Sequence, residues 1–136
     1  AAKESVAQSN QRSEIIRKLK AELISTIKKG VPDIWVNGDQ EKSLPGIISI
    51  TFPKTDSEGL LLLLDSEGIA CSTGSACSAG VQRPSHVLLA MGLTEDETTS
   101  TLRFSLNHSN TIIEIAKLGA VIASVVARSR AASGKK

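Results

Sequence analysis

Residues 69–80, Ile-Ala-Cys-Ser-Thr-Gly-Ser-Ala-Cys-Ser-Ala-Gly, place a run of very small side chains near the middle of the chain. No side chain in residues 73–80 is larger than Thr or Cys, so this stretch cannot build a hydrophobic core. The core must come from the segments on either side, which the small residues connect. Gly74 and Gly80 flank Cys77, and this pattern indicates a flexible loop that presents one thiol.

The length of 136 residues fits one domain with a real core. The aromatic residues are limited to one Trp and two Phe, so the core must consist of Leu, Ile, Val and Ala. With 40% hydrophobic and 22% charged residues, the composition is that of a soluble globular protein.

No apolar run approaches the roughly 18 residues of a membrane span, and residues 1–12 lack the apolar region of a signal peptide. Two cysteines do not form a disulfide framework, so we expect free thiols and a cytoplasmic location. The net charge is +2 and the basic C-terminal residues are typical of a solvated tail. We therefore expect neither nucleic acid nor membrane as a partner.

Residues 1–29 are predicted to form one long helix, because Ile15, Leu19, Leu23 and Ile27 recur every four residues. Gly30 and the proline two residues later predict its end. The apolar stripe fades over residues 1–12. We expect that a packing partner of this segment is missing and that the chain is a fragment.

Alternating or β-branched patterns predict strands over residues 33–37, 46–52, 69–72 and 101–106. Helices are predicted through residues 60–64, after a cap among residues 55–57, and over residues 84–91 and 110–128; residues 93–100 are a polar connection. The predicted fold class is α/β (α+β-like), a small sheet of about four strands covered by helices mainly on one face.

The thiols have different surroundings. A lone cysteine is most often a small buried hydrophobe, but the Gly and Ser neighbours of Cys77 favour exposure. Its reactivity would require a lowered pKa or a nearby base, and Arg83 and His86 are close in sequence. Cys71 alternates within a strand pattern and is predicted to pack. Five residues separate the two cysteines, which is not a zinc-binding spacing, so no metal site is predicted.

Arg103 lies in the middle of a predicted strand, where alternation places it on the face opposite Leu102 and Phe104. It is either a solvated or salt-bridged side chain, or a planar cation that binds a carboxylate with two hydrogen bonds. His86 and His108 have either structural or catalytic roles.

Three segments together resemble a known family: residues 68–80, residues 84–93 (Pro-Ser-His-Val-Leu-Leu-Ala-Met-Gly-Leu) and residues 102–106 (Leu-Arg-Phe-Ser-Leu). They look like the C-terminal small domain of the NifS/IscS-like cysteine desulfurases, pyridoxal-phosphate (PLP) enzymes of fold type I in the class V aminotransferase family. The resemblance covers residues 37–106 well and the end helices by position and pattern. It implies an interdomain helix over residues 1–30, a small domain over residues 31–136 with the cysteine loop at 73–83, and an absent large PLP-binding domain.

Enzymes of this family take sulfur from L-cysteine, which leaves L-alanine and an enzyme persulfide for iron–sulfur cluster and thiocofactor assembly. The resemblance implies that Cys77 is the catalytic nucleophile and persulfide carrier and that Arg103 binds the substrate carboxylate. It assigns the neighbours of Cys77 to the active-site loop: Ser72, Thr73, Gly74, Ser75, Ala76 and Ser78. Glycine hinges suit an arm that moves between a pocket and an acceptor protein.

The resemblance also implies PLP as cofactor and a homodimer in the full-length enzyme. The partners would be L-cysteine and a sulfur-acceptor or iron–sulfur scaffold protein, where Cys77 could contact a scaffold-bound cluster. The Schiff-base lysine of the family follows a histidine, and this sequence contains no His-Lys pair. We therefore expect no cofactor-binding residue in the chain and no activity from the chain by itself.

Two positions depart from the family pattern. Asn107 stands where many relatives have Gly, and Gly46 follows Pro45 where many have Asn. Two other functions remain open: a stand-alone sulfur-carrier or scaffold-docking module, and a PLP aminotransferase or lyase of the same fold, which would not need Cys77.

Overall fold

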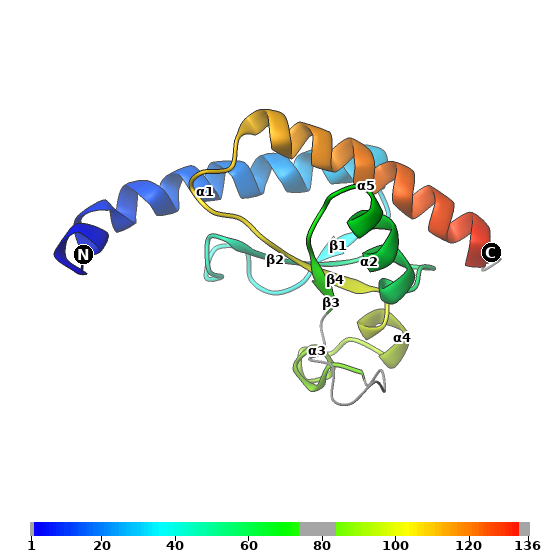
Figure 1. Cartoon of the computed structure of the whole chain (residues 1–136). Coiled ribbons are helices and arrows are strands. Elements are labelled where there is room, and N and C mark those ends of the chain that lie inside the picture. The colour runs from blue at the N-terminus through cyan, green and yellow to red at the C-terminus, as the bar shows by residue number, and fades with distance from the viewer. Residues whose placement is uncertain (1, 74–83, 134–136) are drawn as a thin grey trace.

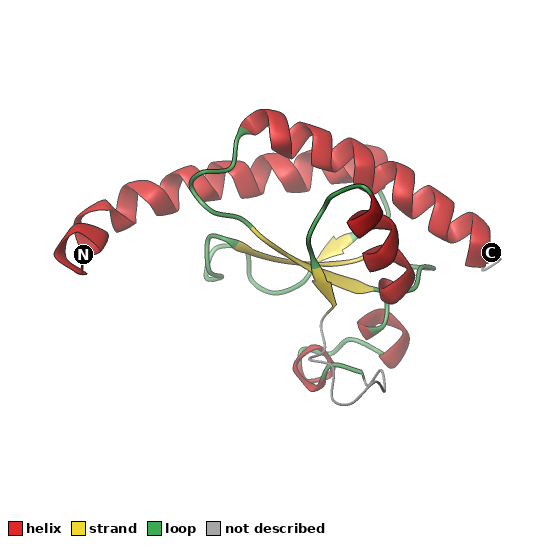
Figure 2. Ribbon diagram, viewed as in Figure 1, coloured by secondary structure: helices red, strands yellow, loops and turns green. Residues whose placement is uncertain are grey.

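The computed structural model of the chain describes residues 2–73 and 84–133. Within these ranges, helices are interspersed among the strands, which form one sheet with helices packed on it (Figures 1 and 2). In chain order the elements are α1 (Ala2–Gly30), β1 (Trp35–Val36), β2 (Ile47–Thr51), α2 (Ser57–Ser66), β3 (Ser72–Thr73), α3 (His86–Ala90), α4 (Glu95–Thr98), β4 (Thr101–Ser105) and α5 (Ile112–Ser133).

The sheet has the strand order β1-β2-β4-β3, and every neighbouring pair is antiparallel. The β2–β4 ladder runs from the pair Ile47–Ser105 to the pair Thr51–Thr101 and forms the centre of the sheet. Because β3 and β4 are neighbours in space, the segment that precedes the small-residue run lies beside the strand that carries Arg103.

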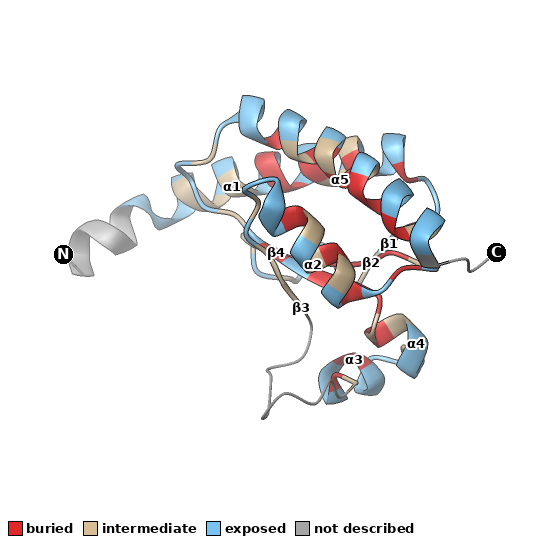
Figure 3. Cartoon of the chain, turned by 45° about the vertical axis from the view of Figure 1, so that its right-hand side comes forward, coloured by how far each residue is buried: buried red, intermediate tan, exposed pale blue. Residues whose placement is uncertain are grey.

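Helices α1, α2 and α5 cover one face of the sheet, as the figures show for the two long helices that lie side by side along it (Figure 1). The apolar residues of the two central strands alternate along each strand, so they lie on this face, and they are buried; Figure 3 colours buried residues red. The strand side chains of this core are Ile48, Ile50, Leu102 and Phe104. The prediction of a small α/β sheet covered mainly on one face is confirmed.

Two glycines let α1 and α5 approach closely. A Cβ atom built on Gly30 would lie 2.6 Å from the Cβ of Ala123, and one on Gly119 would collide with the side chain of Thr26. The first helix was predicted over residues 1–29 with its stop at Gly30; it extends one residue further, and Gly30 is its last residue, where an added side chain would collide with Ala123. The chain leaves the helix at the next residue, Val31, whose side chain is buried in the core.

The predicted third strand, residues 69–72, begins too early. The main-chain N–H of Ile69 still donates to Leu64, and Gly68 adopts a φ of +75°, so the turn that ends α2 extends through Ile69. Strand β3 contains Ser72, as predicted, and Thr73, which the resemblance had assigned to the active-site loop together with Ser72.

The segment 93–100 is not only a polar connection. It contains helix α4, whose start is fixed by a capping box in which Thr94 and Glu97 each bind the other's main-chain N–H. A similar exchange between Thr111 and Glu114 precedes α5, so that helix begins at Ile112 and also extends beyond the predicted end at residue 128. Asp56 is the residue that caps α2, as one of the three candidates predicted.

Among the helices in the described residues, none is long and apolar enough to cross a membrane.

Candidate active site

Arg103 lies at the middle of β4, on the face of the sheet that α1, α2 and α5 leave uncovered. Its side chain is exposed, while Leu102 and Phe104 on either side are buried on the helix-covered face. This placement agrees with the alternation in the sequence. Within residues 2–73 and 84–133, the guanidinium of Arg103 forms no ion pair with a carboxylate.

The residues directly across the sheet from Arg103 are small and polar. Ser49 of β2 pairs with Arg103 on one side, and Ser72 of β3 pairs with it on the other. Paired residues in an antiparallel ladder point to the same face. The guanidinium therefore stands between two serines, neither of which is large enough to cover it.

A hydrogen-bonded row fixes the neighbourhood of Arg103 toward β1. The side-chain amide of Asn37 donates to the hydroxyl of Ser49 over 3.1 Å and to that of Thr51 over 3.0 Å. Thr51 is fully buried and its hydroxyl is 2.8 Å from that of Thr101. These bonds hold the uncovered face of β2 and β4 in one arrangement.

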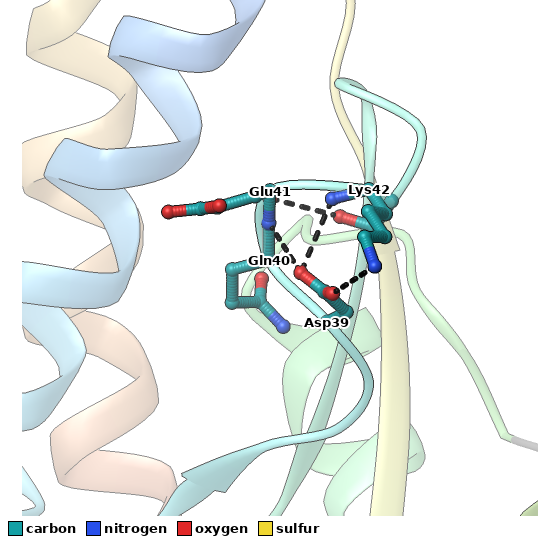
Figure 4. A network of polar contacts seen from close by, with 5 residues as sticks. Asp39, Gln40, Glu41 and Lys42 are labelled. Carbon is teal, nitrogen blue, oxygen red and sulfur yellow. Dashed lines mark hydrogen bonds and ion pairs between the residues drawn. The ribbon is translucent and has the colours of Figure 1, made fainter.

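Asn37 is held in turn by the tight turn that follows it. The amide of Gln40 donates to the main-chain carbonyls of Asn37 and Gly38, at 3.1 and 2.8 Å. Asp39 accepts hydrogen bonds from the main-chain N–H groups of Glu41 and Lys42 (Figure 4). The sequence analysis missed the role of Asn37. The available signal was an Asn before Gly at a strand end, which also predicts an ordinary turn.

The same loop is attached to α1 by a buried lysine. The ammonium of Lys20 donates to the hydroxyl of Ser43 over 2.7 Å, and its side chain is almost completely buried. Burial, with a smaller effect of the nearby Arg17 charge, lowers the pKa of Lys20 from its usual value. The turn beside Asn37 is therefore tied to the helical layer.

Cys77, with Gly74, Ser75, Ala76, Ser78 and Arg83, lies outside the described residues, so its predicted role stays a prediction. The described residues do show where the residues before and after that segment lie. Thr73 leaves β3 next to Leu102 of β4, and the chain is described again from Pro84, just before α3. The cysteine segment is thus attached to the strand that is hydrogen-bonded to the Arg103 strand.

Cys71 has the packing role that its alternation predicted. It is half-buried and packs against the hydrophobic core, on the face opposite Ser72. Burial, and secondarily the charge of Asp65, raises the pKa of Cys71 to about 11. At neutral pH this thiol is therefore protonated and a poor nucleophile.

His86 and His108 are both exposed, the first at the start of α3 and the second in the turn after β4. No group of three or more His, Cys, Asp or Glu side chains that could hold a metal ion occurs in the described part of the chain. Neither histidine is placed in the row of polar residues around Arg103.

The residues around Arg103 do not fit a PLP-binding site. The neighbouring positions on the uncovered face are Asn37, Ser49, Ser72 and Ser105, and none of these side chains can form a Schiff base. The described residues around Arg103 therefore offer no covalent anchor for the cofactor.

The described residues thus form a helix-covered sheet that presents an exposed arginine beside the strand leading into the cysteine segment. Residues 5–118 match the family model "Aminotransferase class-V", and the chain belongs to that family. It is 39% identical to an IscS-like cysteine desulfurase of Mycobacterium tuberculosis. The 124 aligned residues are 90% of this chain and 32% of that protein.

A second relative is the putative cysteine desulfurase IscS 1 of Bacillus subtilis, 39% identical over 120 residues, or 88% of this chain and 32% of the relative. Among solved structures, a NifS-like protein superposes with a TM-score of 0.76 at 26% identity, covering 91% of this chain and 30% of that structure. The chain thus spans about a third of the length of the relatives it matches.

Proposed function

We propose that this chain is the small-domain third of a cysteine desulfurase, in which Arg103 binds the substrate carboxylate and Cys77 receives the sulfur. The observation that carries the proposal is the pairing of Ser72 with Arg103. It attaches the strand that leads into the Cys77 segment to the strand that bears the arginine. The relatives named cysteine desulfurases support the same reading.

Arg103 is suited to a carboxylate because its charge is exposed and is not neutralised by an acidic side chain among the described residues. A guanidinium can bind both oxygens of a carboxylate at once, which fixes orientation as well as position. The serines on either side leave room for a small amino acid. The Asn37–Ser49 hydrogen bond keeps the floor of this site in place.

Cys77 would act as a thiolate that attacks the sulfur of L-cysteine. An S–S bond forms at Cys77 while the C–S bond of the substrate breaks, and the product carbon skeleton becomes L-alanine after protonation. The electron pair of the broken bond must be accepted outside this chain. The proposal also includes three properties of the full-length enzyme. It would use PLP held by the remaining two thirds of the protein, it would be a homodimer, and it would be located in the cytoplasm.

The persulfide would then pass to a sulfur-acceptor or iron–sulfur scaffold protein. A thiol on a segment rooted at one strand and at α3 can serve two positions, the substrate and the acceptor, if the segment moves between them. Cys71 cannot substitute for it, because its raised pKa and core packing keep it protonated and enclosed.

The test is a chimera in which this chain replaces the matching third of the Bacillus subtilis relative. Cys77→Ala should abolish persulfide labelling after incubation with L-cysteine, and Cys71→Ala, the matched control, should retain it. Arg103→Ala should raise KM for L-cysteine roughly 10- to 100-fold, as expected for loss of a charged hydrogen-bonded contact, whereas Arg128→Ala on α5 should leave KM unchanged. Persulfide formation in the Cys77→Ala chimera would reject the assignment.

A further inference from the structure

A cavity separate from the row of residues around Arg103 lies at the opposite end of the uncovered face from the β3 edge. It has a volume of about 460 Å³ and is formed where β1, the turn after β2, and α4 meet. Its lining residues are Trp35, Pro53, Lys54, Thr55, Asp96, Glu97 and Ser100. None of them belongs to the row of residues around Arg103.

The wall of this cavity is aromatic and partly exposed. Trp35 pairs with Thr51 across the β1–β2 ladder, so it points to the uncovered face, and 38% of it is accessible. The buried hydroxyls of the lining are already used within the protein: Thr55 donates to the carbonyl of Phe52 over 2.6 Å, and Ser100 donates to that of Asp96 over 3.0 Å. They add little capacity to bind a ligand.

The free polar capacity belongs to two carboxylates. Asp96 is exposed, and its side chain accepts no hydrogen bond from the described residues. Glu97 uses one oxygen to accept the main-chain N–H of Thr94 at 2.7 Å and keeps the other. Lys54 also lines the cavity, yet among the described residues it forms no ion pair with either carboxylate.

We propose that this Trp35 cavity binds the guanidinium of an arginine side chain on a partner protein. An indole face attracts a cation, most strongly a flat one that can stack on it. A carboxylate beside the ring then accepts two hydrogen bonds from the same guanidinium. The cavity offers both features within one hollow, and this inference does not depend on the sulfur chemistry proposed for Cys77.

Other ligand classes fit less well. An anion would meet the two carboxylates, and an uncharged apolar group would leave them desolvated without a partner. Lys54 lowers the negative charge of the cavity, so the site should select a cation that gains stacking energy as well as Coulomb attraction. Arginine gains more from stacking on the indole than the compact, strongly hydrated ammonium of lysine.

The chain has a built-in probe, because Trp35 is its single tryptophan. Titration of the full 136-residue chain with the peptide acetyl-Gly-Arg-Gly-amide should change the Trp35 emission saturably, with a roughly millimolar Kd for one such side chain. The same peptide with citrulline in place of arginine has nearly the same shape but no charge, and should give no saturable change. An equal response to both peptides would overturn the proposal.

Variants of the acidic wall test the geometry. Asp96→Asn and Glu97→Gln should each weaken binding of the arginine peptide roughly two- to fivefold, and glutamine preserves the capping box of α4. Glu95→Gln is the matched control, since Glu95 lies on the same short helix but does not line the cavity. If all three variants have the same affinity for the arginine peptide, general surface charge explains the binding and the cavity is not the site.

Lys54 gives a test of opposite sign. Lys54 has a φ of +64°, a conformation that asparagine tolerates, so Lys54→Asn should keep the turn intact. Loss of the competing positive charge should tighten binding of the arginine peptide roughly two- to fivefold. Weaker or unchanged binding would contradict the proposal, as would a Trp35 emission that depends on protein concentration without peptide, which indicates a second copy as the occupant.

Discussion

The two faces of the same four-stranded sheet use opposite chemistry. On the helix-covered face, Ile48, Ile50, Leu102 and Phe104 are buried against α1, α2 and α5. On the other face, hydrogen-bonded polar side chains surround an exposed arginine. Adjacent residues of one strand therefore serve stability and recognition separately, because successive side chains point to opposite sides.

This difference separates the residues that stabilise the fold from the residues that can recognise a ligand. The helix-covered face gains stability from apolar area removed from water and from close helix packing. The side chains buried on the uncovered face, such as Thr51 and Thr101, are polar, and this face is ordered by hydrogen bonds between strands. A change on the first face should mainly alter the free energy of unfolding, and one on the second should mainly alter binding.

The largest effect should come from opening the core beneath Arg103. Leu102→Ala removes a fully buried side chain and should lower the free energy of unfolding by about 2–5 kcal/mol. Ser105→Ala, on the uncovered face of the same strand, should change it by less than about 0.5 kcal/mol. Urea denaturation of the two variants measures both values, and similar losses would remove the distinction between the faces.

The reactivity of Cys71 tests whether its thiol is enclosed on the helix-covered face. With a pKa of about 11 against a usual 9.0, Cys71 has about 100-fold less thiolate at pH 8 than an ordinary thiol. Iodoacetamide should therefore modify Cys71 of the folded chain about 100-fold more slowly than the same residue in the urea-unfolded chain. Mass spectrometry of the Cys71 peptide over time measures both rates, and equal rates would contradict the enclosed position.

The raised pKa of Cys71 also makes the free energy of unfolding depend on pH. The folded chain holds the thiol proton more tightly than the unfolded chain, so this contribution is complete below about pH 9 and is lost as the pH rises toward 11. A Cys71→Ala variant should lose less stability across that pH interval than the unchanged chain. Urea unfolding at pH 8 and pH 10.5 gives the comparison.

Helix packing on the covered face should not tolerate one added methyl group. Gly→Ala in an exposed helix normally adds about 1 kcal/mol of stability, but a Cβ atom at Gly119 would collide with Thr26. Gly119→Ala should therefore destabilise the chain by about 1–3 kcal/mol. Thr26→Ala in the same chain should recover part of the loss, and a thermal melt that shows stabilisation instead would exclude tight contact between α1 and α5.

The smallest effects concern two arginines of α5. Arg130 is one-quarter exposed, pairs with Asp33 at 2.9 Å, and donates to the carbonyl of Pro53 at 3.1 Å. Its replacement by alanine should cost about 1 kcal/mol, whereas Arg128→Ala, which removes an exposed pair with Glu67, should cost less than about 0.5 kcal/mol. Chemical denaturation ranks the two, and the reverse order would show that the contacts of Arg130 with Asp33 and Pro53 do not hold α5 in place.

Much of the fold could be predicted because its signals are local. The four-residue spacing from Ile15 to Ile27 predicted α1, and alternation around Arg103 predicted which side chains of β4 are buried. The predicted caps included Asp56. Errors occurred where hydrogen bonds decided an element's boundary, as at Ile69, whose N–H continues the turn of α2 instead of starting a strand.

The candidate site could be predicted only in part. Ser72 and Ser49 are far from Arg103 along the chain, and their meeting depends on the strand order β1-β2-β4-β3. No local pattern in the sequence states that Ser72 and Ser49 flank Arg103, or that Asn37 reaches across to Ser49. The Trp35 cavity likewise joins three segments that are distant in sequence.

The sequence by itself determined the helical and strand periods, the small-residue segment with Cys77, and the motifs that resemble cysteine desulfurases. The tertiary structure alone decided that Arg103 stands between two serines, beside the strand from which the cysteine segment departs. The physical reason is that periodicity and capping depend on neighbouring residues, whereas the strand order depends on burying the apolar faces of distant elements together.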